Sequence, residues 1–301
     1  MVTTLGEISR ESAQRFGDKT ALIIEDKSFS YKEIDAMACR VANGLKASGV
    51  RPGDRVTLYS ANCWEWAVSY HAIAKTGAVI NPINVMLTSD EVKYVVEDSG
   101  AKAVLGSADK AESLLDLKGN NELTDVVLFG DTVPTGATSF EDWLKSGTDT
   151  FEVAVRNRED LAAICYTSGT TGHPKGAMHS HHNILANAQG TAMMHVRTES
   201  DVMVNSLPLP HVYGSVVFNS GFMYGAKLVI VPRFEEEAVL SAIQQHRATI
   251  LDGVPTAYYF LLAHPKFDDY DLSTLTRSTV GGQTLPAAKS IEWEERVGTA
   301  V

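Results

Sequence analysis

Small, polar and flexible residues gather in one stretch, residues 166–176, which reads Tyr-Thr-Ser-Gly-Thr-Thr-Gly-His-Pro-Lys-Gly. Its glycines let the backbone approach a ligand closely, and its hydroxyl groups donate hydrogen bonds. Lys175 adds one positive charge directly after Pro174, which restricts φ and lacks an N–H. Many donors with little side-chain bulk suit a polyphosphate, so the stretch predicts a phosphate-binding loop.

The loop stands in a definite local order. It follows the apolar run 161–165 and precedes a segment that we expect to be helical from about Ser180, so the expected order is strand, loop and helix. The spacing is not that of the pattern G-x-x-x-x-G-K-[ST], because only two residues separate the first two glycines and the lysine is followed by glycine. A surface turn of small polar residues is the alternative. Eleven specified positions between a buried strand and a helix favour a binding loop.

Composition and charge exclude several classes of partner. Apolar residues make up 44% of the 301 residues and charged residues 21%, which is typical of globular proteins. With 26 Lys and Arg against 37 Asp and Glu, the formal net charge is −11. Such a chain repels nucleic acids and anionic membrane surfaces. An anionic nucleotide would therefore have to be bound by local donors and Mg²⁺, and not by the overall field.

The sequence also indicates a compartment. The three cysteines, Cys39, Cys63 and Cys165, are odd in number and share no metal-like spacing, which fits buried thiols in a reducing environment. Glu7, Arg10 and Glu11 place charges near the N-terminus, where a signal peptide would be apolar. No run approaches the ~18 apolar residues of a transmembrane segment. We therefore expect a cytoplasmic protein.

Strands alternate with helices along most of the chain. Residues 55–59, for example, are expected to form a strand and residues 64–75 the helix that follows. Elements of this length in alternation predict an α/β fold whose sheets are largely parallel.

The alternation breaks over residues 131–160, which contain Pro134, Gly136 and many Thr, Asp and Glu residues. We interpret this segment as a surface connection between two layered α/β subdomains, with the change-over near residues 131–185. At the end of the sequence, residues 297–301 are expected to begin another strand.

Residues 166–176 resemble the phosphate-loop signature of the AMP-forming acyl-CoA synthetase superfamily, in particular its fatty-acid and aryl-acid CoA ligases. Further segments that look like motifs of this superfamily follow in the expected order and extend over essentially the whole chain. They are residues 30–34, 74–82, 180–183, 206–214, 254–256, 271–273 and 281–285. The family's later Tyr-Gly-x-Thr-Glu motif and its lysine-bearing C-terminal domain do not occur here. The resemblance therefore describes residues 1–301 as an incomplete N-terminal adenylation domain.

The resemblance implies ATP-dependent activation of a fatty or aryl carboxylic acid, first to acyl-AMP and then to acyl-CoA. It names ATP and Mg²⁺ as cofactors and CoA as a co-substrate, and it is compatible with a homodimer. It also assigns the β- and γ-phosphates of ATP to the loop. The residues concerned are Thr167, Ser168, Gly169, Thr170, Thr171, Gly172 and Lys175.

Under the same resemblance, His211 stands where CoA ligases place a histidine beside the substrate carboxylate, and it is the residue expected to act in catalysis. A histidine there can donate a hydrogen bond and, when protonated, oppose the charge of the carboxylate. The alternative is that His211 caps the helix that follows. Tyr213 and Gly214 would line the acyl tunnel, although for Tyr213 an ordinary core position stays open.

Gly281 and Gly282 match the strand end at which adenine and the acyl group meet in the family, so both groups are expected to contact Gly282. Gln283 would offer an amide to adenine. An ordinary turn at a strand end is the alternative for these glycines. Because glycine leaves space, Gly214, Gly281 and Gly282 weakly favour a medium or long acyl group.

Other polar residues receive structural interpretations. The spacing of His179, His181 and His182 fits no familiar zinc site, so no metal site is expected. Asp252 precedes a glycine and is interpreted as a turn or cap residue. Cys165 is interpreted as a packing residue of the strand, since the sequence suggests no partner base.

Two further functions stay open. The chain could be a nucleotide- or acyl-binding module without turnover, because the lysine that drives adenylation in the family is not among these residues. It could also adenylate an acid for an acceptor other than CoA. The presence of His211 and the lack of carrier-domain material favour a CoA ligase.

Overall fold

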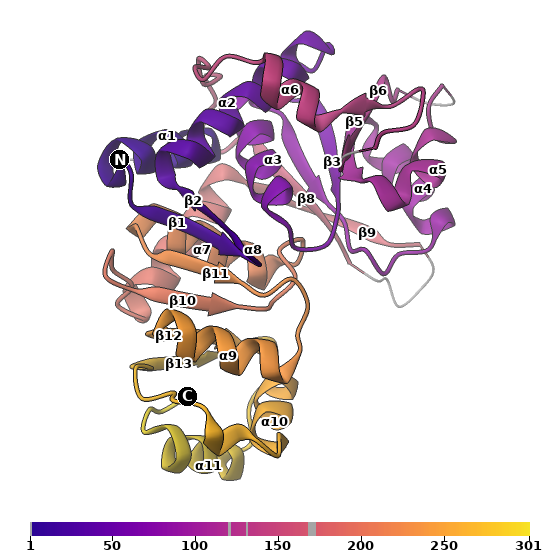
Figure 1. Ribbon diagram of the computed structural model, residues 1–301. Coiled ribbons are helices and arrows are strands. Elements are labelled where there is room, and N and C mark those ends of the chain that lie inside the picture. The colour runs from indigo at the N-terminus through magenta and orange to yellow at the C-terminus, as the bar shows by residue number, and fades with distance from the viewer. Residues whose placement is uncertain (1, 120–121, 131, 168–172) are drawn as a thin grey trace. The chain divides into compact units, whose positions relative to one another are not determined.

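The computed structural model describes residues 2–119, 122–130, 132–167 and 173–301. These residues form two compact units (Figure 1). The first contains Met1–Asp18 and Tyr31–Asn187, and the second contains Lys19–Ser30 and Ala188–Val301. The chain therefore passes between the units near residues 18, 30 and 187. Residues 131–160, interpreted above as a connection, belong to the first unit.

The first unit is built on a seven-stranded sheet with the order β7-β6-β5-β3-β4-β8-β9. All neighbouring strands are parallel except β8 and β9, which are antiparallel. The strands are β3 (Arg55–Tyr59), β4 (Val79–Pro82), β5 (Ala101–Ser107), β6 (Asp125–Phe129), β7 (Thr138–Ser139), β8 (Leu161–Thr167) and β9 (Lys175–Ser180).

Helices flank this sheet, and α4 and α5 lie beside β5 and β6 (Figure 1). The helices are η1 (Leu5–Glu7), α1 (Ile8–Phe16), α2 (Tyr31–Ala47), α3 (Trp64–Lys75), α4 (Ser89–Ser99), η2 (Ala108–Lys110), α5 (Ala111–Leu115), α6 (Phe140–Ser146) and α7 (His181–Met194), whose last residues lie in the second unit. Ten residues of α3 are buried, including Trp66, so this helix contributes to the core along its whole length. No helix among the described residues has the length and apolarity needed to cross a membrane.

The second unit has a six-stranded sheet with the order β13-β12-β10-β11-β1-β2, parallel except for the hairpin β1–β2. Its strands are β1 (Thr20–Ile24), β2 (Lys27–Ser30), β10 (Val202–Asn205), β11 (Lys227–Ile230), β12 (Ile250–Gly253) and β13 (Arg277–Val280). Its helices are α8 (Val212–Tyr224), α9 (Glu236–His246), α10 (Pro255–Ala263), η3 (Phe267–Asp269) and α11 (Ala287–Val297). The predicted α/β class with largely parallel sheets is confirmed.

Three aromatic rings pack together in the core of the second unit. The ring of Trp293 is fully buried and meets the rings of Tyr258 and Phe267 edge-on, with centroids 4.8 and 5.9 Å away. Its indole N–H donates to the hydroxyl of Ser278 at 3.0 Å. The one polar atom of this large apolar side chain is therefore satisfied, as burial of tryptophan requires.

The structure corrects two sequence-based expectations about local structure. The helix expected from about Ser180 is present as α7 from His181, but Lys175–Ser180 forms an unpredicted strand, β9, directly before it. Residues 297–301 do not begin a strand, because α11 continues to Val297 and Gly298 ends it with a φ of 83°. The strand at 175–180 depends on pairing with β8, a contact that the local sequence does not show.

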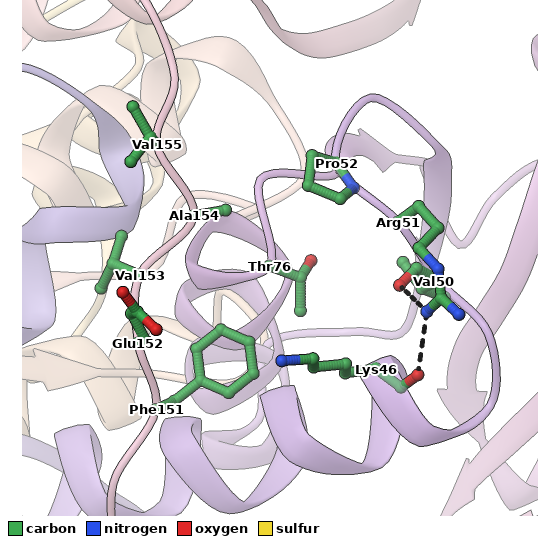
Figure 2. Close-up of a pocket in the computed structure, with 10 residues that line it drawn as sticks. All are labelled: Lys46, Val50, Arg51, Pro52, Thr76, Phe151, Glu152, Val153, Ala154 and Val155. Atoms are coloured by element: carbon green, nitrogen blue, oxygen red, sulfur yellow. Dashed lines mark hydrogen bonds between the residues drawn. The ribbon is translucent and has the colours of Figure 1, made fainter.

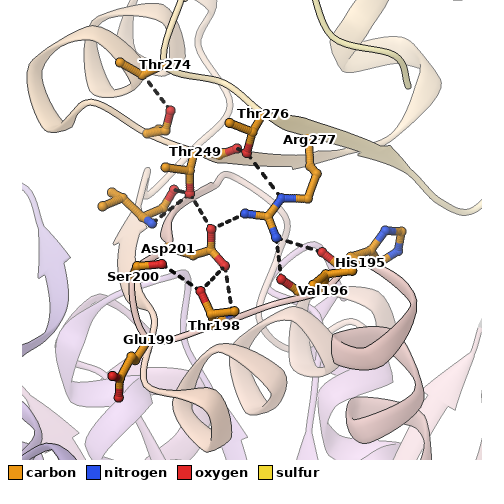
Figure 3. Close-up of polar contacts among 12 residues, drawn as sticks. His195, Val196, Thr198, Glu199, Ser200, Asp201, Thr249, Thr274, Thr276 and Arg277 are labelled. Atoms are coloured by element: carbon orange, nitrogen blue, oxygen red, sulfur yellow. Dashed lines mark hydrogen bonds and ion pairs between the residues drawn. The ribbon is translucent and has the colours of Figure 1, made fainter.

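A polar network ties the C-terminal end of α7 to the sheet of the second unit (Figure 3). The guanidinium of Arg277 donates to the carbonyl oxygens of His195 at 2.8 Å and Val196 at 2.5 Å, and it pairs with Asp201. The other oxygen of Asp201 accepts from the backbone N–H of Thr198 at 2.7 Å. Val196 has a φ of 49°, a costly conformation for a β-branched residue, and Arg277 binds the carbonyl of that residue.

Replacement of Arg277 by Met is expected to lower the free energy of unfolding by about 2 kcal/mol, because the buried Asp201 carboxylate loses a charged donor. Chemical denaturation followed by circular dichroism measures the change. Arg233→Met, at an exposed position of the same unit, is the control and should shift stability by less than about 0.5 kcal/mol. Equal stability of the two variants would contradict a stabilising role for the network.

Candidate functional site

The hairpin β8–β9 carries the described part of the predicted phosphate loop. The two strands pair from Leu161↔Ser180 to Thr167↔Lys175, so Thr167 and Lys175 stand opposite each other at the open end. Both residues are exposed. The other predicted phosphate contacts lie outside the described residues; they are Ser168, Gly169, Thr170, Thr171 and Gly172.

Gly176 has a packing role in this hairpin. A Cβ at Gly176 would lie 2.7 Å from Cγ2 of Ile164 and 3.1 Å from Cζ of Tyr166. The ring of Tyr166 therefore lies across the glycine on the paired strand. A larger residue would displace that ring, which precedes Thr167 directly.

The histidines that follow the loop contact different partners. His181 is 2% exposed, and its Nδ1 accepts a hydrogen bond from the backbone N–H of Leu5 at 3.1 Å. Burial lowers the pKa of His181 to about 4, so its ring is neutral at physiological pH. His182 instead contacts the side chain of Arg158. Across the part of the chain that the structure describes, no group of three or more potential metal ligands converges.

The thiol of Cys165 lies on β8, and burial raises its pKa to about 11. A thiol with a raised pKa is a poor nucleophile at neutral pH. This agrees with the interpretation of Cys165 as a packing residue.

In the second unit, His211 is the N-cap residue of α8, and its Nδ1 accepts from the backbone N–H of Tyr213 at 3.2 Å. The capping interpretation therefore describes an interaction that the structure contains. It does not exclude the other role, because in a neutral imidazole whose Nδ1 accepts, Nε2 carries the proton and can donate. The side chain of His211 is exposed.

Tyr213 lies against the end of β13. Its hydroxyl is 3.0 Å from the hydroxyl of Thr279, and a Cβ at Gly281 would lie 2.7 Å from Cε1 of its ring. Burial, together with the charge of Asp252, raises the pKa of Tyr213 to about 12. The structure thus brings Tyr213 and Gly281 into contact, as two predicted site residues of one unit.

Two of the three glycines expected to leave room for an acyl group do not do so. A Cβ at Gly214 would lie 2.2 Å from the carbonyl oxygen of Pro208, and the space beside Gly281 is filled by Tyr213. These glycines are needed for packing within the protein, so they give no measure of acyl length. Gly282 differs: it is exposed and has a φ of 84°, and among the described residues the atom nearest to a Cβ built there is Cγ1 of Val254, at 3.9 Å. Gln283 is also exposed.

A buried ion pair that sequence reasoning missed is linked to Tyr213 through the hydroxyl of Thr279. Nη2 of Arg197 is 2.5 Å from Oδ1 of Asp252, and both side chains are 0% exposed. The same carboxylate oxygen accepts from the hydroxyl of Thr279 at 2.7 Å. The interpretation of Asp252 as a turn or cap residue is therefore wrong. An aspartate inside the apolar strand Ile250–Gly253 was the available signal, but its partner is 55 residues away.

This ion pair stands at the carboxyl ends of parallel strands. Asp252 is the register partner of Asn205 on β10 and of Thr279 on β13, so the three residues form one row across the sheet. In open α/β sheets, ligands bind beyond the carboxyl ends of the strands. Tyr213, Gly281 and Gly282 lie at the same edge, which makes it the candidate binding edge of the second unit.

A cavity of about 510 Å³ lies elsewhere in the first unit (Figure 2). Phe151 and Glu152 line it on one side, with Lys46 and Arg51 on the other. The ammonium of Lys46 lies 5.8 Å from the centre of the Phe151 ring. None of the predicted site residues is among those that line this cavity.

The Arg197–Asp252 pair gives a direct stability test. Arg197→Met should lower the free energy of unfolding by about 3–5 kcal/mol, because it leaves a buried carboxylate without its counter-ion. The double variant Arg197→Met/Asp252→Leu should be more stable than Arg197→Met alone, since no buried charge remains. Urea denaturation of the single variants and the double variant measures the coupling. Strictly additive losses would show that the two charges do not stabilise each other.

Comparison with known proteins identifies the family of this chain. The model of the AMP-binding enzyme family matches residues 9–301. A long-chain-fatty-acid–CoA ligase of Bacillus subtilis (strain 168) is 29% identical over 324 residues, covering 98% of this chain and 58% of the ligase. An anthranilate CoA ligase solved in complex with anthranoyl-AMP superposes with a TM-score of 0.94 at 30% identity, covering 99% of this chain and 58% of that one.

The ATP-bound structure of MatB from Rhodopseudomonas palustris gives a TM-score of 0.90 at 32% identity, covering 100% of this chain and 59% of MatB. The chain thus spans a little under three fifths of the length of these relatives, in their N-terminal portion. The family match over residues 9–301, with the α/β sheets and the hairpin that carries Thr167 and Lys175, establishes that this chain belongs to the AMP-binding enzyme family.

Proposed function

We propose that the protein activates a carboxylic acid with ATP and transfers the acyl group to CoA. The observation that carries this proposal is the β8–β9 hairpin, which presents Lys175 opposite Thr167 in a chain of the AMP-binding enzyme family. Relatives named as ligases of fatty acids and of anthranilate support the reaction class.

In the first step, a carboxylate oxygen of the acid attacks the α-phosphorus of ATP, and the bond to pyrophosphate breaks. Negative charge gathers on the leaving phosphates, so the protein contributes mainly position and electrostatic stabilisation. The ammonium of Lys175 and the hydroxyl of Thr167 are both exposed at the open end of the hairpin. We assign them to the β- and γ-phosphates, together with the loop residues between them.

Mg²⁺ neutralises phosphate charge when it is bound. In proteins it keeps several waters and is held by substrate phosphates with one or two carboxylates.

We assign the acid to the second unit. The Nε2–H of His211 can donate to the substrate carboxylate while its Nδ1 caps α8. Tyr213 and Gly282 stand at the carboxyl edge of the same sheet and are assigned to the acyl group. In the second step, the thiol of CoA attacks the acyl carbonyl, AMP leaves and the thiol proton is released. Both fatty and aryl acids remain within the proposal.

Exchange of labelled pyrophosphate into ATP, measured with a panel of fatty and aryl acids, tests the proposal. We expect acid-dependent exchange when the family's lysine-bearing domain is present, because formation of acyl-AMP is reversible, and little or none from residues 1–301 alone. With that domain present, ATP binding without exchange for any acid would contradict activation and would favour a nucleotide-binding role without turnover.

Lys175→Ala is expected to weaken ATP binding about tenfold, more than the loss of any single hydroxyl, because charged donors bind phosphate more strongly than neutral ones. Thr167→Val supplies the comparison, and Lys145→Ala, an exposed lysine on α6 of the same unit, supplies the control. Isothermal titration with MgATP measures the three dissociation constants. Unchanged affinity of Lys175→Ala for MgATP would show that Lys175 does not bind the phosphates.

His211→Asn separates the two roles of this residue, since asparagine is itself a good N-cap. Stability should be retained, whereas kcat/KM for the acid should fall roughly tenfold to a hundredfold through loss of the donor to the carboxylate. Acid-dependent pyrophosphate exchange and thermal unfolding measure the two effects. If His211→Asn exchanges like the unaltered protein while His211→Ala is only destabilised, the residue is a cap and nothing more.

A further inference from the structure

We propose that Tyr94 and Asp98 of α4 are positioning residues for nucleotide binding, because from one helix face they contact Tyr166 on β8 and His173 just before β9. Neither residue is assigned to the phosphates, so their effect must pass through the hairpin. The proposal rests on the proposed function.

The first contact holds β8. The hydroxyl of Tyr166 donates to Oδ2 of Asp98 at 2.5 Å. A phenol that donates to a carboxylate forms a short, charge-assisted hydrogen bond, which is about twice as strong as a neutral one. Burial and this bond to Asp98 raise the pKa of Tyr166 well above its usual value, so the phenol keeps its proton. Tyr166 directly precedes Thr167, the first assigned phosphate contact.

The second contact holds the chain where it enters β9. The imidazole of His173 stacks on the ring of Tyr94, with centroids 4.4 Å apart and an angle of 15° between the planes. His173 lies two residues before Lys175. Tyr94 and Asp98 are four residues apart on α4 and therefore share one face of the helix, with 3.5 Å between the Tyr94 hydroxyl and Oδ1 of Asp98.

Helix α4, which makes both contacts, is held by its caps and by its packing against the core. Thr88 and Glu91 form a capping box at its start, and Gly100 ends it in the left-handed conformation. Val92, Val95 and Val96 are almost fully buried in a core cluster of the first unit. Tyr94 and Tyr166 pack against the same cluster. The hairpin is therefore attached to the core at this point.

Such anchoring matters for a ligand that is bound by several weak donors. Holding both strands before the ligand arrives removes part of the ordering cost that binding would otherwise have to offset. The contacts also fix Thr167 and Lys175 relative to one helix, in addition to their pairing with each other.

Because Asp98 is negatively charged, its removal changes the affinity for MgATP in opposite directions under a purely electrostatic role and under a positioning role. By Coulomb's law alone, removing a carboxylate near a polyphosphate should tighten binding. A positioning role makes the opposite prediction: Asp98→Ala should weaken MgATP binding about fivefold, at the lower end of usual coupling strengths. Glu97→Ala is the matched control, because it removes the same charge from the adjacent, exposed position of α4. It should bind MgATP as the unaltered protein does, or slightly more tightly.

Conservative variants separate an effect on MgATP binding from an effect on folding. Tyr166→Phe removes only the hydroxyl and should weaken MgATP binding to a similar extent. The double variant Asp98→Ala/Tyr166→Phe should be no weaker than either single variant, since all three lack the same bond. Tyr94→Leu should weaken binding, whereas Tyr94→Phe, which keeps the ring that stacks on His173, should not.

Titration of the 301-residue chain with MgATP, alongside thermal unfolding of each variant, decides the matter. Weaker binding by Asp98→Ala, Tyr166→Phe and Tyr94→Leu, with Glu97→Ala and Tyr94→Phe unaffected, is the expected result. Unchanged or tighter binding by Asp98→Ala and Tyr166→Phe would overturn the inference, even if unfolding temperatures fell, because the contacts would then be structural only. Failure of the unaltered chain to bind MgATP would overturn the proposed function, and this inference with it.

Discussion

The antiparallel pairing of β8 with β9 is the constraint on which the candidate phosphate site depends. The rest of the seven-stranded sheet is parallel, so this hairpin is the point where the chain reverses directly and presents two strand ends together. The register places Thr167 opposite Lys175, a hydroxyl donor and a cation. A shift of one residue would turn every side chain of the shifted strand to the other face of the sheet. The packing of Tyr166 across Gly176 favours the register that is observed.

The second unit holds polar groups next to an apolar core. Asp252 is fully buried in β12, and it is stabilised there by Arg197 and by the hydroxyl of Thr279. Tyr213 joins this network through Thr279 and covers Gly281. A connected, largely buried polar network therefore underlies the carboxyl ends of these strands, and we assign the acid to this end of the sheet because α/β sheets bind ligands there.

Much of the fold could be predicted because it depends on local patterns. Residues 55–59 are predicted to form a strand and residues 64–75 a helix, and β3 and α3 have those bounds. The strand β9 was missed because Lys-Gly-Ala-Met-His-Ser lacks the alternation of an ordinary strand, and its conformation depends on the partner β8. Asp252 was misread for a related reason: its interpretation depends on Arg197, which is distant in sequence. Pairs of this kind, including Tyr166 with Asp98 at a separation of 68 residues, leave no trace in local spacing.

The role of the glycines illustrates the same limit. The sequence indicates that these positions require small residues, but it does not show what fills the space beside them. At Gly214 it is the carbonyl oxygen of Pro208, and at Gly281 it is the ring of Tyr213. Of Gly214, Gly281 and Gly282, only Gly282 combines exposure with a positive φ.

The central claim is that the hairpin binds the phosphates of ATP, and footprinting of Lys175 tests it most directly. Lysines can be labelled with a limiting amount of an acylating reagent, with and without MgATP, and the modified peptides quantified by mass spectrometry. The account predicts that MgATP protects the ammonium of Lys175 while the exposed Lys145 is labelled to the same extent in both samples. Equal labelling of Lys175 with and without saturating MgATP would contradict it.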